Sequence, residues 1–265
     1  MIKKSIYKMG PLLKRAFFIG SLLTLTACST TKSADWSFQL DQPISSDYAA
    51  HLKYLGSSFL NTPGTETIRL SSSSKKYLND IYSRLVKNNE LLLPQNDRPN
   101  FNVIKSRIPY YFSLPGSDFY FSTGLIERYL KNEQLLVAML SAETFKSTNL
   151  IYEKNVVVPT GFITIERMLS LVKVPLPVKS EINNNSYLIL RRSGYDPSAY
   201  LIWLQTQNKN MLDFSLQHGT TRRLSREEYL FKNFIASKKD RFEGIEEKNS
   251  SKQFYQFINE IKGQL

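Results

Sequence analysis

The sequence has a single cysteine, Cys28, among its 265 residues, so no disulfide can form within one chain. It has only two histidines, His51 and His218. A Gly-x-Ser-x-Gly motif, a glycine-rich phosphate loop and a dinucleotide-binding fingerprint are all absent. These absences argue against a serine hydrolase with a nucleophile elbow and against a nucleotide-dependent enzyme.

Long runs of one charge are also absent. The chain carries 35 Lys and Arg against 23 Asp and Glu, and the cations are scattered in pairs such as Lys75-Lys76 and Arg191-Arg192. Nucleic-acid binding proteins gather their cations in a stripe or patch, so we expect no nucleic-acid partner. Such a surface is typical of plain solubility, and a surface that tolerates anionic lipid is the weaker interpretation.

The N-terminal region has the pattern of an export signal. Five cations and no acids precede an uncharged stretch over 16–27. Those twelve residues would span about 18 Å as a helix, too short for a hydrocarbon core of about 30 Å. Leu25-Thr26-Ala27-Cys28 resembles the bacterial lipobox, which implies cleavage before Cys28 and acylation of its thiol. An ordinary cleaved signal peptide is the alternative.

The pattern along the chain predicts four segments. They are a signal peptide over 1–27, a lipidated tether and N-terminal extension over 28–69, a main domain over 70–240 and a helical tail over 241–265. Within the main domain we expect an α+β fold, with a small β-sheet packed on a mainly helical body.

Periodicity and turn residues place the individual elements. Ser71 to Ser74 offer a cap for a helix with Tyr77, Leu78 and Ile81 on one face. We expect strands over 101–105, 110–114 and 118–122, with a turn over 115–117. The later helices are expected at 123–131, 133–149, 160–173, 180–193, 197–208, 225–237 and 251–262.

Five segments, taken in order, carry a resemblance to a known family. They are FSLPG at 112–116, FYFSTGLI at 119–126, NEQLLVAML at 132–140, GYDP at 194–197 and HGTTRRL at 218–224. Together they resemble the zinc metallopeptidases related to HtpX and the CAAX prenyl proteases, especially the soluble periplasmic members of the BepA type. The resemblance covers roughly 70–240 and implies a zincin-like fold.

The chain departs from this family at the metal site. The family places two zinc-binding histidines four residues apart on a helix, with a catalytic Glu after the first. Here those positions read Ala142, Glu143 and Lys146, so only the vestigial general base Glu143 remains. The position of the family's third ligand falls on Lys179, and Glu181 lies two residues further on.

These replacements argue against zinc because alanine has no donor atom and an ammonium repels a divalent cation. Lys146 lies three residues after Glu143, so the two side chains can pair across one helical turn. Our hypothesis is that the ammonium fills the space of the metal and partly neutralises Glu143. The alternative is a solvated helix face. A zinc site made mostly of carboxylates, including Glu153 and Glu181, would suit this metal poorly.

Other candidate residues follow from the same resemblance. In BepA-like members the histidine equivalent to His218 can lean onto the zinc, and Arg222 lies in the same segment as a possible vestige. In active relatives an edge strand holds the substrate in extended form. The aromatic residues Phe119, Tyr120 and Phe121 are therefore predicted to provide a peptide-binding edge.

The leading functional hypothesis is a catalytically inactive envelope lipoprotein that binds peptides or proteins as an adaptor or chaperone-like factor. It would be held by lipidated Cys28, and the absence of Asp after that residue favours the periplasmic face of the outer membrane over the inner membrane. No cofactor is expected. The alternatives are an active metalloendopeptidase of envelope quality control, which would need zinc, and a structural lipoprotein of the cell envelope.

Overall fold

The computed structural model describes residues 46–93, 98–153, 161–219, 221–238 and 250–265. The chain divides into a unit up to Ser37 and a unit from Phe38 onward, and every described residue belongs to the second unit. The predicted signal peptide and the acylated Cys28 lie outside the described residues.

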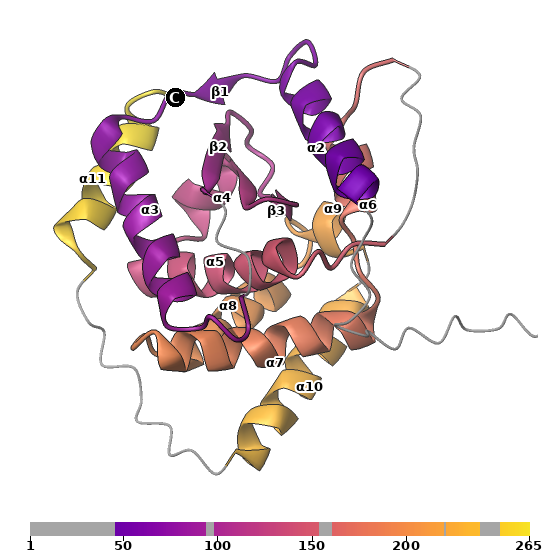
Figure 1. Ribbon diagram of the computed structural model, residues 1–265, viewed down its shortest axis with the longest axis vertical. Helices are drawn as coiled ribbons and strands as arrows, with labels where there is room; N and C mark the ends of the chain where they lie inside the picture. Colours follow the sequence, from indigo (N-terminus) through magenta and orange to yellow (C-terminus); the bar gives the residue numbers. More distant parts are fainter. Residues whose placement is uncertain (1–45, 94–97, 154–160, 220, 239–249) are drawn as a thin grey trace, which may run out of the picture. The chain divides into compact units, whose positions relative to one another are not determined.

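The prediction of an α+β fold is confirmed: the described residues form a mainly helical body with a small four-stranded sheet (Figure 1). The strands are β1 (Thr67–Ile68), β2 (Asn100–Ile104), β3 (Tyr111–Leu114) and β4 (Asp118–Ser122). The helices are α2 (Ser46–Leu60), α3 (Ser72–Lys87), α4 (Thr123–Arg128), α5 (Glu133–Thr148), α6 (Ile165–Leu171), α7 (Leu176–Arg192), α8 (Ser198–Lys209), α9 (Ser215–His218), α10 (Thr221–Ser237) and α11 (Lys252–Lys262).

The sheet has the strand order β1-β2-β4-β3. Strands β2 and β4 are parallel, whereas β1 with β2 and β3 with β4 are antiparallel. A tight turn joins β3 to β4 and requires positive φ at Gly116 (80°) and Ser117 (58°). All four residues of β3 are buried, because α5 and α2 both contact this strand.

Helix α5 is the central helix of the body. Asn132 begins it by accepting a hydrogen bond from the backbone N–H of Leu135, 3.0 Å away. From Leu135 to Thr148 every residue is buried, because α5 contacts β3, α3, α7 and α8. A helix that is covered on all sides has no solvated face for charged side chains. Glu143 and Lys146 are therefore held inside the protein.

Two elements were not expected from the sequence. Helix α2 falls in the predicted N-terminal extension, and its buried residues Tyr48, Leu52, Leu55 and Phe59 recur at helical spacing. Strand β1 is only two residues long and pairs with β2. The extension over 28–69 thus contains structure that packs on the body.

Several predicted helix boundaries were wrong by a few residues. Helix α7 begins at Leu176 rather than at 180, because a proline is tolerated in the first helical turn. Helix α6 begins at Ile165 rather than at 160, after Thr164 accepts from the backbone N–H of Arg167. Helix α4 ends at Arg128, and α10 begins before 225.

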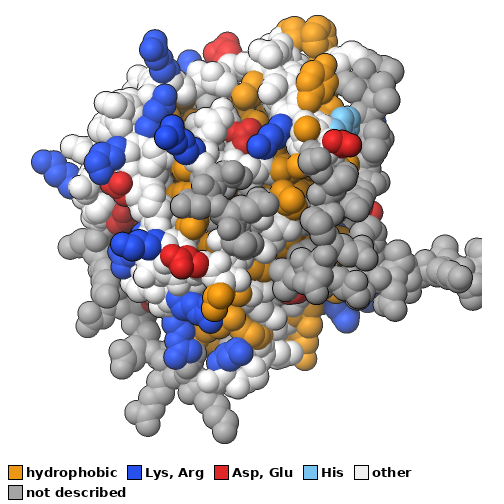
Figure 2. All heavy atoms as spheres, in the orientation of Figure 1, with side chains coloured by type: hydrophobic (Ala, Val, Ile, Leu, Met, Phe, Trp, Pro, Cys, Tyr) orange, Lys and Arg blue, Asp and Glu red, His pale blue; other side chains and the backbone are white. Residues whose placement is uncertain are grey.

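Among the described residues, no helix is long and apolar enough to cross a membrane. Figure 2 shows basic side chains with acidic ones among them on the part of this face where α3 and α11 lie. The exposed cations of these helices include Lys75, Lys87 and Lys252, and Lys76 pairs with Asp80.

Candidate functional site

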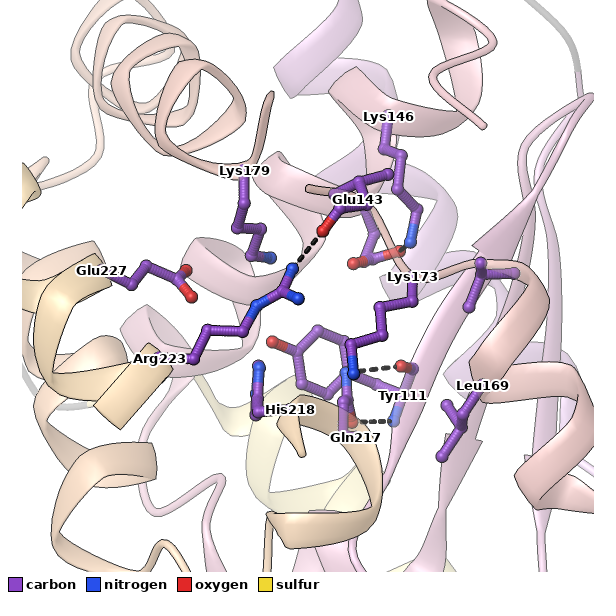
Figure 3. A pocket seen from close by; sticks show the side chains of 12 residues that line it. Tyr111, Glu143, Lys146, Leu169, Lys173, Lys179, Gln217, His218, Arg223 and Glu227 are labelled. Carbon is purple, nitrogen blue, oxygen red and sulfur yellow. Dashed lines mark hydrogen bonds and ion pairs between the residues drawn. The ribbon is translucent and has the colours of Figure 1, made fainter. Parts of the chain in front are cut away.

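A small cavity of about 50 Å³ lies between α5, α7, α9, α10 and the first residue of β3. Figure 3 shows the side chains that line it. The lining residues are Tyr111, Glu143, Lys146, Leu169, Val172, Lys173, Val174, Lys179, Gln217, His218, Arg223 and Glu227. Three of the predicted site positions, Glu143, Lys146 and Lys179, therefore meet here together with His218.

The α5 wall of the cavity carries a buried ion pair. Lys146 Nζ lies 2.5 Å from Glu143 Oε2, and the two side chains are only 7% and 3% exposed. The same carboxylate oxygen accepts a hydrogen bond from Ser113 Oγ on β3 at 2.8 Å. The predicted pairing is present, and the solvated alternative is wrong because α5 has no exposed face here.

Burial lowers the pKa of Lys146 from its ordinary value, and contact with Glu143 opposes that shift. Nearby Lys179 lowers it further by charge repulsion. The carboxylate of Glu143 thus favours the charged form of Lys146, against the effects of burial and of Lys179.

The residues at the positions where the resemblance would place metal ligands do not fit zinc. Ala142 has only a methyl group, which cannot bind a metal. Lys146 forms an ion pair with Glu143, and Lys179 adds a second ammonium to the cavity lining. Within the part of the chain that the structure describes, no cluster of three or more His, Cys, Asp or Glu could hold a metal ion. The donor set of this cavity is that of an ion pair and not of a zinc centre.

The α9 wall of the cavity is built around His218. His218 Nε2 lies 2.5 Å from Gln207 Oε1 of α8, and this oxygen also accepts from the hydroxyl of Tyr111 at 3.1 Å. The hydroxyl of Tyr111 in turn lies 3.4 Å from Trp203 Nε1, which donates to it. Burial, together with Lys179, Arg223 and Lys173, lowers the pKa of His218 well below 6.5, so its imidazole is neutral at pH 7.

The α10 wall holds a second buried carboxylate. Glu227 Oε1 accepts a hydrogen bond from Asn183 Nδ2 at 2.9 Å, and Asn183 Oδ1 accepts from the hydroxyl of Tyr200 at 2.6 Å. Glu227 Oε2 is buried and has no hydrogen-bond partner.

Three cations face the same space as Glu227. The side chains of Lys173, Lys179 and Arg223 point into the cavity (Figure 3). Arg223 Nη2 donates to the backbone oxygen of Val174. None of the three forms an ion pair with a carboxylate of the described residues. The cavity thus has a surplus of positive charge on the side away from α5.

Of the predicted metal positions and possible vestigial residues, Ala142, Arg222 and Glu181 lie outside the cavity lining. Arg222 is exposed, and its neighbour Arg223 enters the cavity instead, one helical turn before Glu227 on α10. Glu181 is half-buried, and burial raises its pKa, but it does not line the cavity. Neither Arg222 nor Glu181 reaches the Glu143–Lys146 pair.

The prediction of a peptide-binding edge at Phe119, Tyr120 and Phe121 is wrong. These residues belong to β4, which lies between β2 and β3, and all three side chains are buried. The edge next to the cavity is β3. There the side-chain amide of Gln217 donates to the backbone oxygen of Tyr111 at 2.8 Å and accepts from its N–H at 3.1 Å.

The rest of the β3 edge is also occupied. The hydroxyl of Tyr152 donates to the backbone oxygen of Ser113 at 3.1 Å. Added to the two bonds of Gln217, this contact places side chains where a further strand would pair. A ligand of the cavity is therefore better recognised by side chains than by strand addition.

Sequence reasoning missed Lys173, Gln217, Arg223 and Glu227 as lining residues. The resemblance gave no role to them. The spacing of Arg223 and Glu227, four residues apart on a predicted helix, was a signal that they share a face. For Lys173 and Gln217 the sequence carried no such signal, because the loop before α7 and the four-residue helix α9 are positioned by packing.

No protein-family model matches the chain, and no curated protein sequence matches it.

Proposed function

We propose that this chain is an envelope lipoprotein whose peptidase-like body binds peptide or protein clients without cleaving them. Acylated Cys28 would hold it at the periplasmic face of the outer membrane. The zincin-like fold and the kinship with the HtpX and BepA type of peptidases are part of this proposal. The described fold supports it only at the level of a small sheet on a mainly helical body.

The observation that carries the proposal is the buried pair on α5. A catalytic carboxylate must be free to accept a proton from a water activated by the metal. Here Glu143 Oε2 is occupied by Lys146 at 2.5 Å and by Ser113 at 2.8 Å. The residues that would bring the metal are Ala142 and two lysines, so this carboxylate stabilises an ammonium instead of activating water.

Binding without catalysis is supported by the opposite side of the cavity. Exposed Lys173 and half-buried Lys179 lack ion-pair partners among the described residues, and buried Glu227 Oε2 lacks a donor. A buried polar atom without a partner costs stability. A ligand that supplies a donor would satisfy this oxygen.

The proposal is tested with the full-length lipoprotein in the bacterium that makes it. A photoreactive residue at exposed Ser215, on the same short helix as Gln217 and His218, should crosslink to a defined set of envelope clients. A matched probe at exposed Tyr255 on α11 should not. Identical products at both positions would contradict client binding at this cavity.

Catalysis is tested separately with purified full-length protein. Casein incubated with the protein and added zinc should stay intact. Cleavage that is abolished by Glu143→Gln and by a chelator would contradict the proposal, because it would require a working metal centre.

A further inference from the structure

The cavity contains cationic side chains and a carboxylate oxygen, two kinds of group that normally pair with each other. The surplus cations Lys173, Lys179 and Arg223 lie on one part of its wall, and the orphan oxygen of Glu227 lies on another. In Figure 3 these four side chains point toward a common space. They come from α7, α10 and the loop before α7, so their convergence is a product of the fold.

The unsatisfied oxygen, Glu227 Oε2, is the more specific of these two features. Glu227 is 1% exposed, and its other oxygen is fixed by Asn183. Leaving such a buried acceptor unsatisfied costs stability. The two carboxylates of the cavity therefore differ, since Glu143 meets Lys146 and Ser113 while Glu227 still needs a donor.

The charge balance of the cavity favours a ligand with a negative charge. Lys146, Lys173, Lys179 and Arg223 stand against Glu143 and Glu227, an excess of two cations. His218 adds no charge at pH 7, because burial and these same cations lower its pKa. A small anion placed among the cations would relieve their mutual repulsion.

We propose that the cavity binds an α-carboxylate whose neighbouring carbon carries an N–H group. The carboxylate would lie at Lys179 and Arg223 with Lys173 at the mouth, and the N–H would donate to Glu227 Oε2. This inference rests on the proposed function and deepens it by naming the ligand chemistry.

Two sources supply this chemistry, the C-terminal residue of a peptide and a free amino acid. A cavity of about 50 Å³ accepts only a small end group such as glycine or alanine. A carboxylate held by two cationic donors also uses the stronger, charge-assisted type of hydrogen bond.

The test uses the full-length lipoprotein in detergent and a fluorescent hexapeptide ending in alanine. The free acid should bind, and the same peptide with a C-terminal amide should bind roughly tenfold or more weakly, the loss expected for one charge-assisted contact. Lys179→Met and Glu227→Gln should each weaken the free acid. Lys76→Met, a lysine substitution on the exposed face of α3, should leave binding unchanged.

A competition experiment distinguishes a peptide C-terminus from a free amino acid as the ligand. Free alanine that competes as well as the unlabelled peptide identifies a free amino acid, and weaker competition identifies a peptide C-terminus. Acetate or inorganic phosphate competing as well as alanine overturns the inference, because neither carries the N–H. Equal binding of acid and amide also overturns it but leaves client binding intact, since crosslinking at Ser215 does not depend on a free carboxylate.

A second readout does not depend on variants that could misfold. The chain has only two histidines, so labelled imidazole signals of His218 and His51 can be followed separately by NMR. A bound carboxylate offsets the cations around His218, so its pKa should rise on saturation with alanine while the His51 signal stays unchanged. No change at His218 with either the alanine-terminated peptide at saturation or millimolar alanine overturns the inference.

Discussion

The two sides of the cavity differ in whether their charged side chains have partners. On the α5 side, Glu143 and Lys146 satisfy each other across one helical turn. On the α7 and α10 side, Lys179 has no ion-pair partner among the described residues, and Glu227 keeps one oxygen without a donor. The contrast separates a buried ion pair, whose charges satisfy each other, from groups that lack partners among the described residues. In our proposal the pair stands where the family has its metal, and the other groups bind a ligand.

The comparison is tested most strongly by the two lysines. Lys146→Met leaves Glu143 buried without its counter-ion and should lower the free energy of unfolding by about 3–5 kcal/mol. Lys179→Met removes a cation that has no partner and should change it by less than about 0.5 kcal/mol. Denaturant unfolding of both variants measures the difference. Equal losses would mean that the two sides are alike.

A double variant checks the cause of that loss. Glu143→Gln together with Lys146→Met removes both buried charges, so it should recover most of the stability lost in Lys146→Met alone. A double variant as unstable as Lys146→Met would show that packing of the lysine side chain, and not the orphaned carboxylate, caused the loss.

The two carboxylates give a matched but smaller contrast. Glu143→Gln should cost about 2 kcal/mol, less than the lysine change, because Lys146 can lose its proton when its counter-ion is gone. Glu227→Gln keeps an acceptor for Asn183 and should cost less than about 1 kcal/mol. A larger loss for Glu227→Gln would show that Glu227 is the structural carboxylate.

The smallest effect is a pH dependence that arises at His218. Its pKa is lowered in the folded protein, whereas in the unfolded chain it lies near 6.5. Below pH 6.5 the unfolded state takes up a proton that the folded state does not, so stability should fall by at most about 1.4 kcal/mol per pH unit. His218→Gln should flatten this slope between pH 6.5 and 5, and Lys179→Met should reduce it. A slope unchanged in both variants would contradict this assignment.

Much of the fold followed from the sequence because its signals are local. The cap at Ser71, the aromatic hairpin and the apolar run at the start of α5 each depend on residues close together in the chain. Helix α2 was missed although Tyr48, Leu52 and Leu55 repeat at helical spacing, because the segment was interpreted as an extension of the tether. Strand β1 is too short to leave a signal.

The site was predictable only where it lies on one helix. Glu143 and Lys146 share a face by their spacing, so their pairing could be expected. The order of strands in the sheet depends on long-range pairing, so the sequence does not indicate that β4 lies inside the sheet and not at its edge. Arg223 and not Arg222 enters the cavity because of the rotation of α10 relative to α7. This rotation depends on packing between the helices and cannot be deduced from the sequence.

The most direct test of the account is the zinc content of the full-length protein after incubation with excess zinc and removal of loosely bound ions. The wild-type chain should retain no stoichiometric zinc. The variant Ala142→His/Lys146→His/Lys179→Glu, which restores the family's donors, should gain zinc if the resemblance places these positions correctly. One zinc per wild-type chain would contradict the claim that a buried ion pair has replaced the metal.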